Sequence, residues 1–411
     1  MSRPLEGVRV LDFTIAQQGP HAMMMLAQMG AEVIRVDRFG PNVPPDRPSP
    51  RDHHMVGFSF AHALGKSSVA VDVRRPEGRE IVLRLVKTAN IVTSNFRPGV
   101  MEKLGLGFDD MRAVNSHIVY VTGSGWGRLG PYPQRTSLDM AAQAAGGMVW
   151  LSGYEGRPPA PASCAISDQV GGLTLCAGTL AALVRAERTG EAVHVDTSLY
   201  GGGPALQAWE MNASSLAGHT VRSGPSHGIL HARGMVWRAF ETSDEWITLA
   251  VEDAPTFARL CKALGAPELA ERYADDESRA AGIEVIEERI DELLAVQSAA
   301  HWLVVLREQD VPAARVQHFA EVFADPQARA NGYVGRTTHP DFGEIDVAGL
   351  PIIFDRTPIA PPPPAVRGAD TDRHLADLGY DDEEISQLRD DGVIGDGSRR
   401  ASIPADGRFS D

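Results

Sequence analysis

The segment Val8–Asp37, VRVLDFTIAQQGPHAMMMLAQMGAEVIRVD, decides the fold class that the sequence predicts. The apolar run over Val8–Phe13 predicts a buried strand, and the residues of His21–Met29 predict a helix. Gly30 and Ala31 end that helix, and Glu32–Asp37 predicts a second strand. A strand–helix–strand unit of this kind is typical of a parallel sheet, so we expect an α/β protein with a Rossmann-like sheet domain.

The loop between this strand and helix argues against a dinucleotide cofactor. It reads TIAQQGP over Thr14–Pro20, whereas a bound pyrophosphate needs the close backbone approach that G-x-G-x-x-G allows. Asp37 does lie about where a ribose-binding acid would be expected. The missing glycines nevertheless indicate that the Rossmann-like sheet binds no dinucleotide.

The rest of the chain predicts two domains, the larger one discontinuous. Strands and helices keep alternating as far as residue 197, which predicts a parallel sheet covered on both faces. A hairpin over Met235–Thr242 and Trp246–Val251, followed by several helices, predicts a smaller α+β domain. We therefore assign 1–200 and 326–411 to the large domain, 225–315 to the small domain, 201–224 and 316–325 to connectors, and 395–411 to a mobile tail.

The composition narrows the class of function. The chain has 411 residues and a net charge of −15, which argues against non-specific binding to nucleic acid. Its three cysteines show no metal-ligand spacing and no disulfide framework, so we expect no metal site and a cytoplasmic location. The N-terminus lacks the pattern of a signal peptide, and the longest nearly apolar run, Cys176–Val184, is too short to span a membrane.

The segment Gly123–Gly147, GSGWGRLGPYPQRTSLDMAAQAAGG, contains the candidate catalytic residue. Its glycines and prolines indicate a loop, and Ser137 as an N-cap predicts a short helix over Leu138–Ala145. Asp139 lies in the first turn of that helix, where the exposed N–H groups and the helix dipole keep a carboxylate ionised. Such a carboxylate is able to attack an acyl group, although most first-turn aspartates only complement the dipole.

A set of short motifs runs in order along nearly the whole chain, from about Leu5 to Ile394. In chain order they are LEGVRVLDFT from Leu5, LAQMGAEVIRV from Leu26, NFRPG from Asn95, GSGWG from Gly123, GPY from Gly130, Asp139-x-x-x-Gln143-Ala144, ERTG from Glu187, Asp325-Pro326 and the region Gly379–Asp381. Together they resemble the family III CoA-transferases, which include formyl-CoA transferase, carnitine CoA-transferase and α-methylacyl-CoA racemase. Each motif alone is weak, but the ordered set is highly specific.

The resemblance implies a covalent mechanism in which Asp139 is the nucleophile. Its carboxylate attacks an acyl-CoA thioester to form a mixed anhydride, which the released CoA thiolate converts to an aspartyl-CoA thioester. A second acid then takes the CoA through a second anhydride. The expected substrates are thus an acyl-CoA and a small carboxylic acid, with no tightly bound cofactor. The resemblance also implies a homodimer of two chains threaded through each other.

The resemblance further implies a set of residues around CoA. Gln17 is expected to line the active site, Arg38 and Arg97 to face CoA, and backbone N–H groups of the glycine loop to meet the oxyanion. Each of these side chains also has a purely structural alternative, such as capping a loop or facing solvent. The full set of CoA-binding candidates is Gln17, Arg38, Lys66, Asn95, Arg97, Gly123, Gly125, Trp126, Gly127 and Tyr132.

The sequence departs from the family's pattern at two places. The family's usual Asn-Arg-Gly-Lys-Arg-Ser is Ala63–Ser68 here, with Leu64 and Ser67 at the positions of two arginines. Only Lys66 then remains to meet a phosphate, which puts tight recognition of the CoA 3′-phosphate in doubt. The family's glycine-rich substrate loop corresponds to the connector Gly224–Gly228, so substrate choice there should differ. Asp168 matches a family aspartate before a helix predicted from Val170, where an acid has a structural alternative.

Two other functions remain open on the same fold. Racemisation of a 2-methylacyl-CoA needs a base on each face of the α-carbon. The racemases have a histidine directly before the aspartate, whereas Leu138 here carries no titratable group, which favours transfer. The other alternative is a non-catalytic CoA-binding protein, which the altered Ala63–Ser68 segment favours and the retained Asp139 opposes.

Overall fold

The computed structural model describes residues 3–40, 53–153, 157–219, 227–340 and 342–395. Gly224–Ser226 of the predicted substrate connector and residues 396–411 of the predicted tail lie outside these ranges. The chain divides into two compact units. The large unit comprises Met1–Ala142, Ala165–Gly203 and Phe323–Asp411, and the small unit comprises Gln143–Cys164 and Pro204–Val322.

The boundaries of these units differ from the predicted domains in two respects. The segment 143–164 groups with the small unit, although the sequence places it in the large domain. Most of the two predicted connectors also belongs to the small unit, which runs from Pro204 to Val322. The large unit is discontinuous, with three stretches of the chain instead of two.

The large unit is built on a seven-stranded sheet with the order β12-β3-β2-β1-β4-β5-β6. The central strand β1 pairs in parallel with β2 on one side and with β4 on the other, with Val10 opposite both Val33 and Ile91. The strand order therefore reverses between β1 and β4, which is where ligands bind in open α/β sheets. The strands are β1 (Arg9–Asp12), β2 (Glu32–Arg38), β3 (Ser67–Val71), β4 (Ile91–Ser94), β5 (Val119–Ser124), β6 (Val193–Ser198) and the antiparallel edge strand β12 (Ile394–Gly395).

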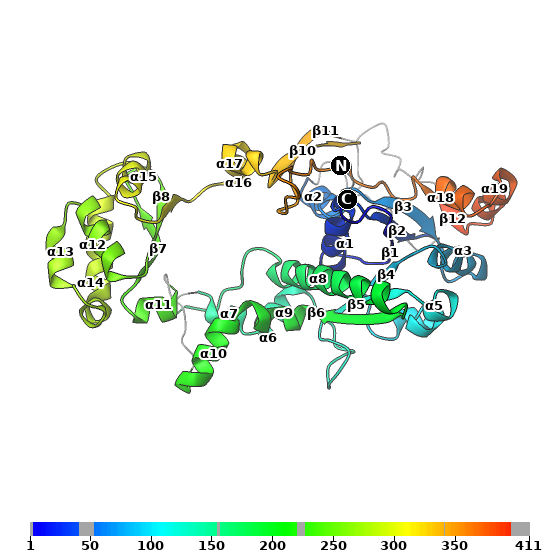
Figure 1. Ribbon diagram of the computed structural model, residues 1–411, viewed down its shortest axis with the longest axis horizontal. Helices are drawn as coiled ribbons and strands as arrows, with labels where there is room; N and C mark the ends of the chain where they lie inside the picture. Colours follow the sequence, from blue (N-terminus) through cyan, green and yellow to red (C-terminus); the bar gives the residue numbers. More distant parts are fainter. Residues whose placement is uncertain (1–2, 41–52, 154–156, 220–226, 341, 396–411) are drawn as a thin grey trace, which may run out of the picture. The chain divides into compact units, whose positions relative to one another are not determined.

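Helices cover both faces of this sheet, as the sequence predicts (Figure 1). On one face, α1 (Gln18–Gln28) and α8 (Ile166–Thr189) pack on strand residues such as Val10 and Val121. On the other face, neighbouring strand residues such as Leu11 and Tyr120 contact another group of helices. These are α3 (Pro76–Val86), α5 (Phe108–Val114), α18 (Thr371–Asp377) and α19 (Asp382–Asp390). Both faces are buried, which accounts for the nearly continuous apolar runs of the strands.

Helix α8 begins at Ile166, four residues earlier than the sequence indicates, so Asp168 lies in its first turn. By length and composition alone, α8 could also cross a membrane. Its buried residues include Leu175, Cys176 and Leu183, which belong to the core between the sheet and α1. Packing inside the large unit is therefore sufficient to explain its apolar composition.

The remaining elements of the large unit lie beside the sheet. A separate antiparallel pair, β10 (Val334–His339) and β11 (Gly343–Ala348), packs its Val347 and Ile345 against Met24 and Leu64. The large unit also contains the helices α2 (His53–Phe60), α4 (Val100–Lys103) and α17 (Pro326–Ala330). Three further helices, α6 (Asp139–Ala145), α9 (Leu199–Leu206) and α16 (Phe319–Ala324), contain three of the four points where the chain passes from one unit to the other, and the fourth lies between Cys164 and Ala165.

The small unit is an α+β domain with its own core. The predicted hairpin is confirmed as β7 (Val236–Glu241) and β8 (Trp246–Val251), and β9 (Ala313–Arg315) extends it to three strands. Residues such as Phe240, Phe257 and Ile290 fill the core between this sheet and its helices. The helices are α7 (Met148–Leu151), α10 (Ala208–Ala217), α11 (Gly228–Ala232), α12 (Ala254–Ala263), α13 (Pro267–Arg272), α14 (Asp276–Leu294) and α15 (Ala299–Glu308).

Candidate functional site

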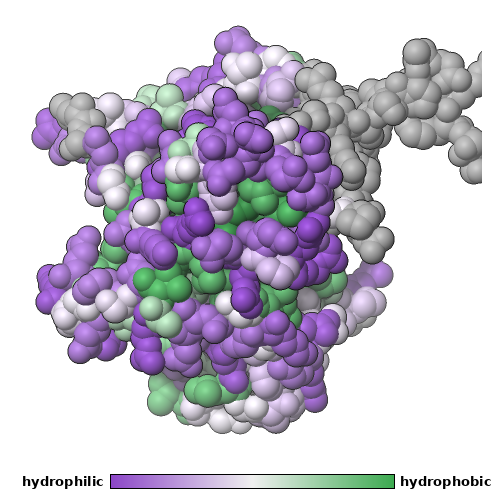
Figure 2. All heavy atoms as spheres, turned by 90° about the vertical axis from the view of Figure 1, so that its right-hand side faces the viewer, coloured by the Kyte–Doolittle hydropathy of each residue, from purple (hydrophilic) through white to green (hydrophobic). Residues whose placement is uncertain are grey.

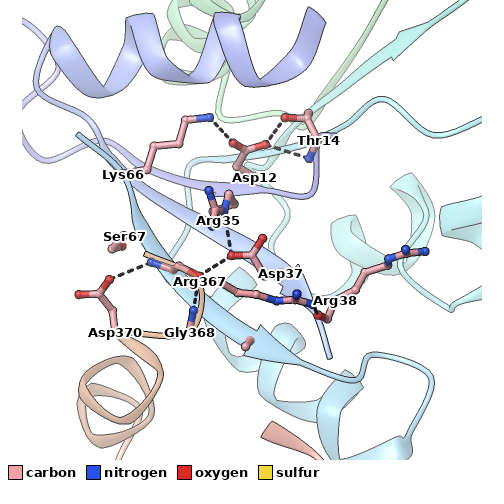
Figure 3. Close-up of polar contacts among 12 residues, drawn as sticks. Asp12, Thr14, Arg35, Asp37, Arg38, Lys66, Ser67, Arg367, Gly368 and Asp370 are labelled. Atoms are coloured by element: carbon pink, nitrogen blue, oxygen red, sulfur yellow. Dashed lines mark hydrogen bonds and ion pairs between the residues drawn. The ribbon is translucent and has the colours of Figure 1, made fainter. Parts of the chain in front are cut away.

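A buried ion pair fixes the loop that leaves β1 at the point where the strand order reverses. Lys66 Nζ lies 2.8 Å from Asp12 Oδ2 and donates to the carbonyl oxygen of Pro20 at 3.0 Å (Figure 3). The side chains of Lys66 and Asp12 are only 1% and 0% exposed. Asp12 Oδ1 accepts hydrogen bonds from the N–H of Thr14 at 2.9 Å and from its hydroxyl at 2.5 Å. Lys66 thus holds the β1–α1 loop in place, and its role as a phosphate ligand stays a prediction.

Asn95 holds the same loop from the neighbouring strand. Its Oδ1 accepts from the N–H of Ile15 at 2.8 Å, and its Nδ2 donates to the carbonyl oxygen of Ile15 at 2.7 Å. The next residue, Ala16, has a φ of 60°, a conformation that residues other than glycine rarely adopt. Because Asn95 follows β4, these bonds connect the ends of the two strands that flank the reversal point. Asn95, a CoA-binding candidate by sequence, therefore shapes the loop.

The β1–α1 loop carries two glutamines to the first turn of α8. Gln169 Nε2 donates to Gln17 Oε1 at 3.0 Å. The backbone N–H of Gln18 donates to the carboxylate of Asp168. Sequence reasoning identified Gln17 but missed Gln18, whose contribution comes from its backbone and has no side-chain signature.

Gln18 is 3% exposed, and two glycines allow its side chain to pack closely against the backbone of β5 and of α8. A Cβ at Gly123 would lie 2.7 Å from Gln18 Oε1, and a Cβ at Gly171 would lie 3.0 Å from Gln18 Nε2. Another candidate, Gly125, approaches Ser137 so closely that a Cβ would lie 2.2 Å from its Cβ. These glycines thus have a packing requirement that is independent of any ligand.

Two aspartates with different environments meet at the start of α8. Asp139 is the first residue of α6, and its Oδ1 accepts from the backbone N–H groups of Ser167 at 2.8 Å and of Asp168 at 3.1 Å. Asp139 therefore caps α8, whose N-cap residue Ala165 offers no side-chain acceptor. The pKa of Asp168 is raised to about 6, chiefly by burial and then by the negative charge of Asp139, while the backbone of Gln18 opposes the shift.

The loop after β5 leads to Asp139 through a cluster of predicted site residues. Arg97 Nη2 donates to Thr136 Oγ1 at 2.8 Å, and Trp126 Nε1 donates to the carbonyl oxygen of Thr136 at 3.3 Å. The Trp126 ring lies 6.1 Å from that of Tyr132 and 5.6 Å from that of Tyr200, between centroids. Arg97, Trp126 and Tyr132 thus build this loop around Thr136.

One backbone N–H group of the predicted oxyanion site already makes a hydrogen bond inside the same loop. The N–H of Gly127 donates to Ser124 Oγ at 2.9 Å. That donor is used inside the loop, where Gly127 has a φ of 87°, and the role of Gly127 beside CoA stays a prediction.

A pocket of about 260 Å³ is lined in part by the β1–α1 loop. Its cationic side chains are Arg35, Lys66 and Arg367, and Arg35 Nε lies 2.7 Å from Asp37 Oδ2. Arg38 is exposed at the end of β2, and its side chain extends away from the Asp12–Lys66 pair (Figure 3). The lining is Thr14, Ile15, Ala16, Pro20, Arg35, Asp37, Val56, Phe58, Phe60, His62, Ala63, Lys66, His339, Pro340, Phe342 and Pro364–Arg367.

The fold and site define a class of protein: a doubly wound α/β unit with a carboxylate at a helix N-terminus and a pocket lined by the β1–α1 loop. Within the described ranges, no group of three or more His, Cys, Asp or Glu side chains could hold a metal. Residues 5–371 match the family model described as CoA-transferase family III. The chain therefore belongs to the CoA-transferase family III.

Individual relatives agree with this assignment. The chain is 31% identical to the human succinyl-CoA:glutarate CoA-transferase, covering 95% of this chain and 90% of that protein. It is 33% identical to the succinyl-CoA:mesaconate CoA-transferase of Haloarcula hispanica, covering 91% and 95%. Among solved structures, a CAIB/BAIF family protein from Brucella suis has a TM-score of 0.78 and 26% identity, covering 92% of this chain and all of that chain at 100%.

We predict that Lys66→Met strongly destabilises the protein, because it leaves the Asp12 carboxylate buried without a cation. Removing one partner of a buried pair costs about 3–5 kcal/mol of unfolding free energy. Urea denaturation followed by circular dichroism measures this change. The control is Arg336→Ala, which breaks a surface pair with Asp346 and should cost about 0–1 kcal/mol. Equal stabilities of the two variants would contradict the role given to Lys66.

Proposed function

We propose that this CoA-transferase passes CoA from the acyl-CoA thioester to the free carboxylic acid through a covalent intermediate on Asp168. The observation that carries the choice of Asp168 is its environment in the first turn of α8. Burial and the charge of Asp139 raise its pKa to about 6, which makes it more basic than an ordinary aspartate while leaving it mainly ionised at neutral pH. A more basic carboxylate is the stronger nucleophile.

Asp139 has the opposite kind of environment. Two backbone N–H groups of α8 donate to its Oδ1, so its negative charge is stabilised by the helix that it caps. This arrangement supports a role in which Asp139 positions the first turn of α8 and keeps Asp168 basic. The sequence-based assignment of Asp139 as the nucleophile stays a prediction, and the experiment below decides between the two aspartates.

The proposed transfer takes place in two symmetric halves. The Asp168 carboxylate attacks the thioester carbonyl, the C–S bond breaks, and the mixed anhydride and CoA thiolate form. The thiolate attacks the aspartyl carbonyl, which releases the first acid and leaves an aspartyl-CoA thioester. The carboxylate of the second acid then attacks that thioester, and the expelled thiolate attacks the acceptor carbonyl of the second anhydride. This step yields the new acyl-CoA and restores Asp168.

Positioning supplies much of the rate in such a mechanism, because a carboxylate is a weak nucleophile. The backbone N–H of Gln18 and the cap by Asp139 fix the Asp168 carboxylate and its helix turn. These contacts support a positioning role for the first turn of α8 in the proposed transfer.

Short dicarboxylic acids are the proposed acceptors, with succinyl-CoA as donor. The support comes from the two relatives above, whose names specify succinyl-CoA together with glutarate or mesaconate. A panel of succinate, glutarate, mesaconate and oxalate, with mass spectrometry of the CoA products, identifies the pair. An absence of CoA transfer from every donor would instead favour the non-catalytic CoA-binding alternative.

We predict that hydroxylamine converts Asp168, and not Asp139, to a hydroxamate during turnover, because only an acylated carboxylate reacts. Peptide mass spectrometry locates the modification. Asp168→Asn should abolish transfer and the adduct. Asp139→Asn should keep both at reduced rate, since its amide oxygen still accepts from Ser167. A hydroxamate on Asp139, together with an active Asp168→Asn variant, would overturn the assignment.

The pH dependence of kcat/KM tests the raised pKa of Asp168. The group is neutral below about pH 6 and ionised above it, and only the carboxylate attacks. With a donor and acceptor that do not titrate in this range, kcat/KM should fall about tenfold per pH unit below the pKa. Asp139→Asn removes the negative neighbour and should move the fall to lower pH. A shift to higher pH would contradict the proposed coupling.

We predict transfer without racemisation, because Leu138 offers no base where the racemases have a histidine. Its side chain is 72% exposed and apolar. The measurement is incubation with a 2-methylacyl-CoA in D₂O, with and without an added acid. CoA should appear on the acid while the α-carbon stays undeuterated. Enzyme-dependent α-deuteration with inversion, and no transfer to any acid, would favour the racemase alternative.

We predict a homodimer of interlocked chains, and helix α10 supports a contact between copies. None of its residues is buried, although Trp209, Met211 and Leu216 are 52%, 49% and 91% exposed. By contrast, the face of the large unit in Figure 2 is mainly hydrophilic, with apolar residues in small separate areas. Exposed apolar clusters of this kind mark interaction sites.

Sedimentation equilibrium should give a dimer at micromolar concentration, and interlocking should make its dissociation very slow. Because a charge on α10 would be buried at the contact, Met211→Glu with Leu216→Glu should shift the protein toward monomer. The matched control is Val285→Glu on α14, also about half exposed at 50%. A monomeric wild type would refute the prediction.

A further inference from the structure

The side chain of Gln18 contains a buried hydrogen-bond donor that has no partner. Gln18 is 3% exposed, and its Nε2 makes no hydrogen bond to any residue that the structure describes. A donor that leaves water without gaining an acceptor lowers the stability of the folded protein. Such groups are few in native proteins, and each calls for an explanation, such as a role in catalysis or a ligand that accepts from it.

Two glycines place the Gln18 carboxamide beside the first turn of α8. A Cβ at Gly171 would lie 3.0 Å from Gln18 Nε2, and a Cβ at Gly123, near the end of β5, would lie 3.4 Å from it. Gly171 comes one helical turn after Asp168, so the two residues share a face of α8. Side chains of a helix point toward its N-terminus, so the space over Gly171 borders the Asp168 side chain. The carboxamide of Gln18 lies in this space.

The backbone of Gln18 already contacts the proposed nucleophile. Gln18 is the first residue of α1, where backbone N–H groups have no acceptor within the helix. Its N–H donates to the Asp168 carboxylate. Its carbonyl oxygen is also close to α8, since a Cβ at Gly172 would lie 2.8 Å from it. An acyl group bonded to Asp168 would therefore lie next to the residue whose side chain has an unused donor.

The carboxamide is able to turn toward such an acyl group while the backbone of Gln18 stays in place. The last torsion of a glutamine side chain is broad, and the amide nitrogen carries two N–H donors. The neighbouring Gln17 is in a different situation, because its Oε1 accepts from Gln169 Nε2 at 3.0 Å. Of these two loop glutamines, Gln18 is thus the one with an unpartnered amide nitrogen beside Asp168.

We propose that Gln18 Nε2 donates a hydrogen bond to the acyl oxygen of the substrate while Asp168 attacks the thioester. The proposal rests on the assignment of Asp168 as the nucleophile. When the carboxylate adds to the thioester carbonyl, the electron pair of the C=O bond moves to the acyl oxygen. This oxygen carries a negative charge until the C–S bond breaks and CoA thiolate leaves. A donor already in place stabilises this charge and lowers the barrier.

The test compares Gln18→Met with the unaltered protein. Methionine is unbranched and flexible like glutamine but has no N–H group. The replacement removes an unpartnered buried donor, so the variant should melt at the same or a higher temperature. Its kcat for transfer should fall about 100-fold, because loss of one oxyanion donor has an effect of that size. A role in packing alone would not combine slower transfer with unreduced stability.

Gln28→Met is the matched control. Gln28 is the last residue of α1, about 15 Å from Gln18 along the helix axis. It is 0% exposed, and neither polar atom of its side chain has a hydrogen-bond partner among the described residues. Gln28→Met should therefore also keep or raise the melting temperature, but it should leave kcat unchanged. An undiminished kcat in Gln18→Met, or an equal loss in both variants, would overturn the proposal.

Two acyl donors show which oxygen accepts from Gln18. Every thioester has the acyl oxygen, whereas succinyl-CoA also has a remote carboxylate that butyryl-CoA lacks. Rapid-quench measurement of adduct formation should give the same fold loss in Gln18→Met with both donors. A loss confined to succinyl-CoA would assign the contact to the remote carboxylate and overturn the proposal. A hydroxamate on Asp139, with transfer still slowed in Gln18→Met, would contradict the choice of nucleophile alone.

Discussion

The buried Asp12–Lys66 ion pair is the interaction on which the arrangement of the site depends. Taking two charges out of water is costly, and the cost is offset here because the remaining polar atoms of both groups are used. Asp12 also accepts from Thr14, and Lys66 also donates to Pro20. The pair therefore ties both ends of the β1–α1 loop, and the same loop contacts the first turn of α8 through Gln17 and Gln18.

Different residues of this loop make different contacts. Thr14, Ile15 and Ala16 line the pocket, and the backbone of Gln18 contacts Asp168. Hydrogen bonds from Asn95 also hold the loop in its conformation. The loop lies where the strand order reverses, and the described strands contain one such position.

The sheet was predictable from sequence because the residues that indicate each strand and each helix end lie close together in the chain. Apolar runs such as Val8–Phe13 and a helix stop at Gly30 are read within a few residues, and the parallel sheet covered on both faces is confirmed. The start of α8 was not predictable in this way. Ala165 offers no capping side chain, and Asp139 supplies the acceptor from 28 residues upstream. The same distant contact hid the different environments of the two aspartates.

The role of Lys66 was hidden for the same physical reason. A lysine after a glycine is typical of a phosphate ligand, and its actual partner is Asp12, 54 residues earlier. Burial and pairing are properties of the folded chain, so the local sequence pattern does not indicate them. Arg367 is the complementary case, since its neighbours in sequence give no indication that it lies at a pocket near β2.

The most direct test of this account is the transfer of oxygen from the acceptor acid to the enzyme. An acceptor with both carboxyl oxygens replaced by ¹⁸O forms the second anhydride through one of them. Breakdown of that anhydride by CoA thiolate leaves this oxygen on the enzyme's carboxylate. Fragmentation mass spectrometry after turnover should find the label on Asp168. Label on Asp139, or turnover without any label on the protein, would contradict the account.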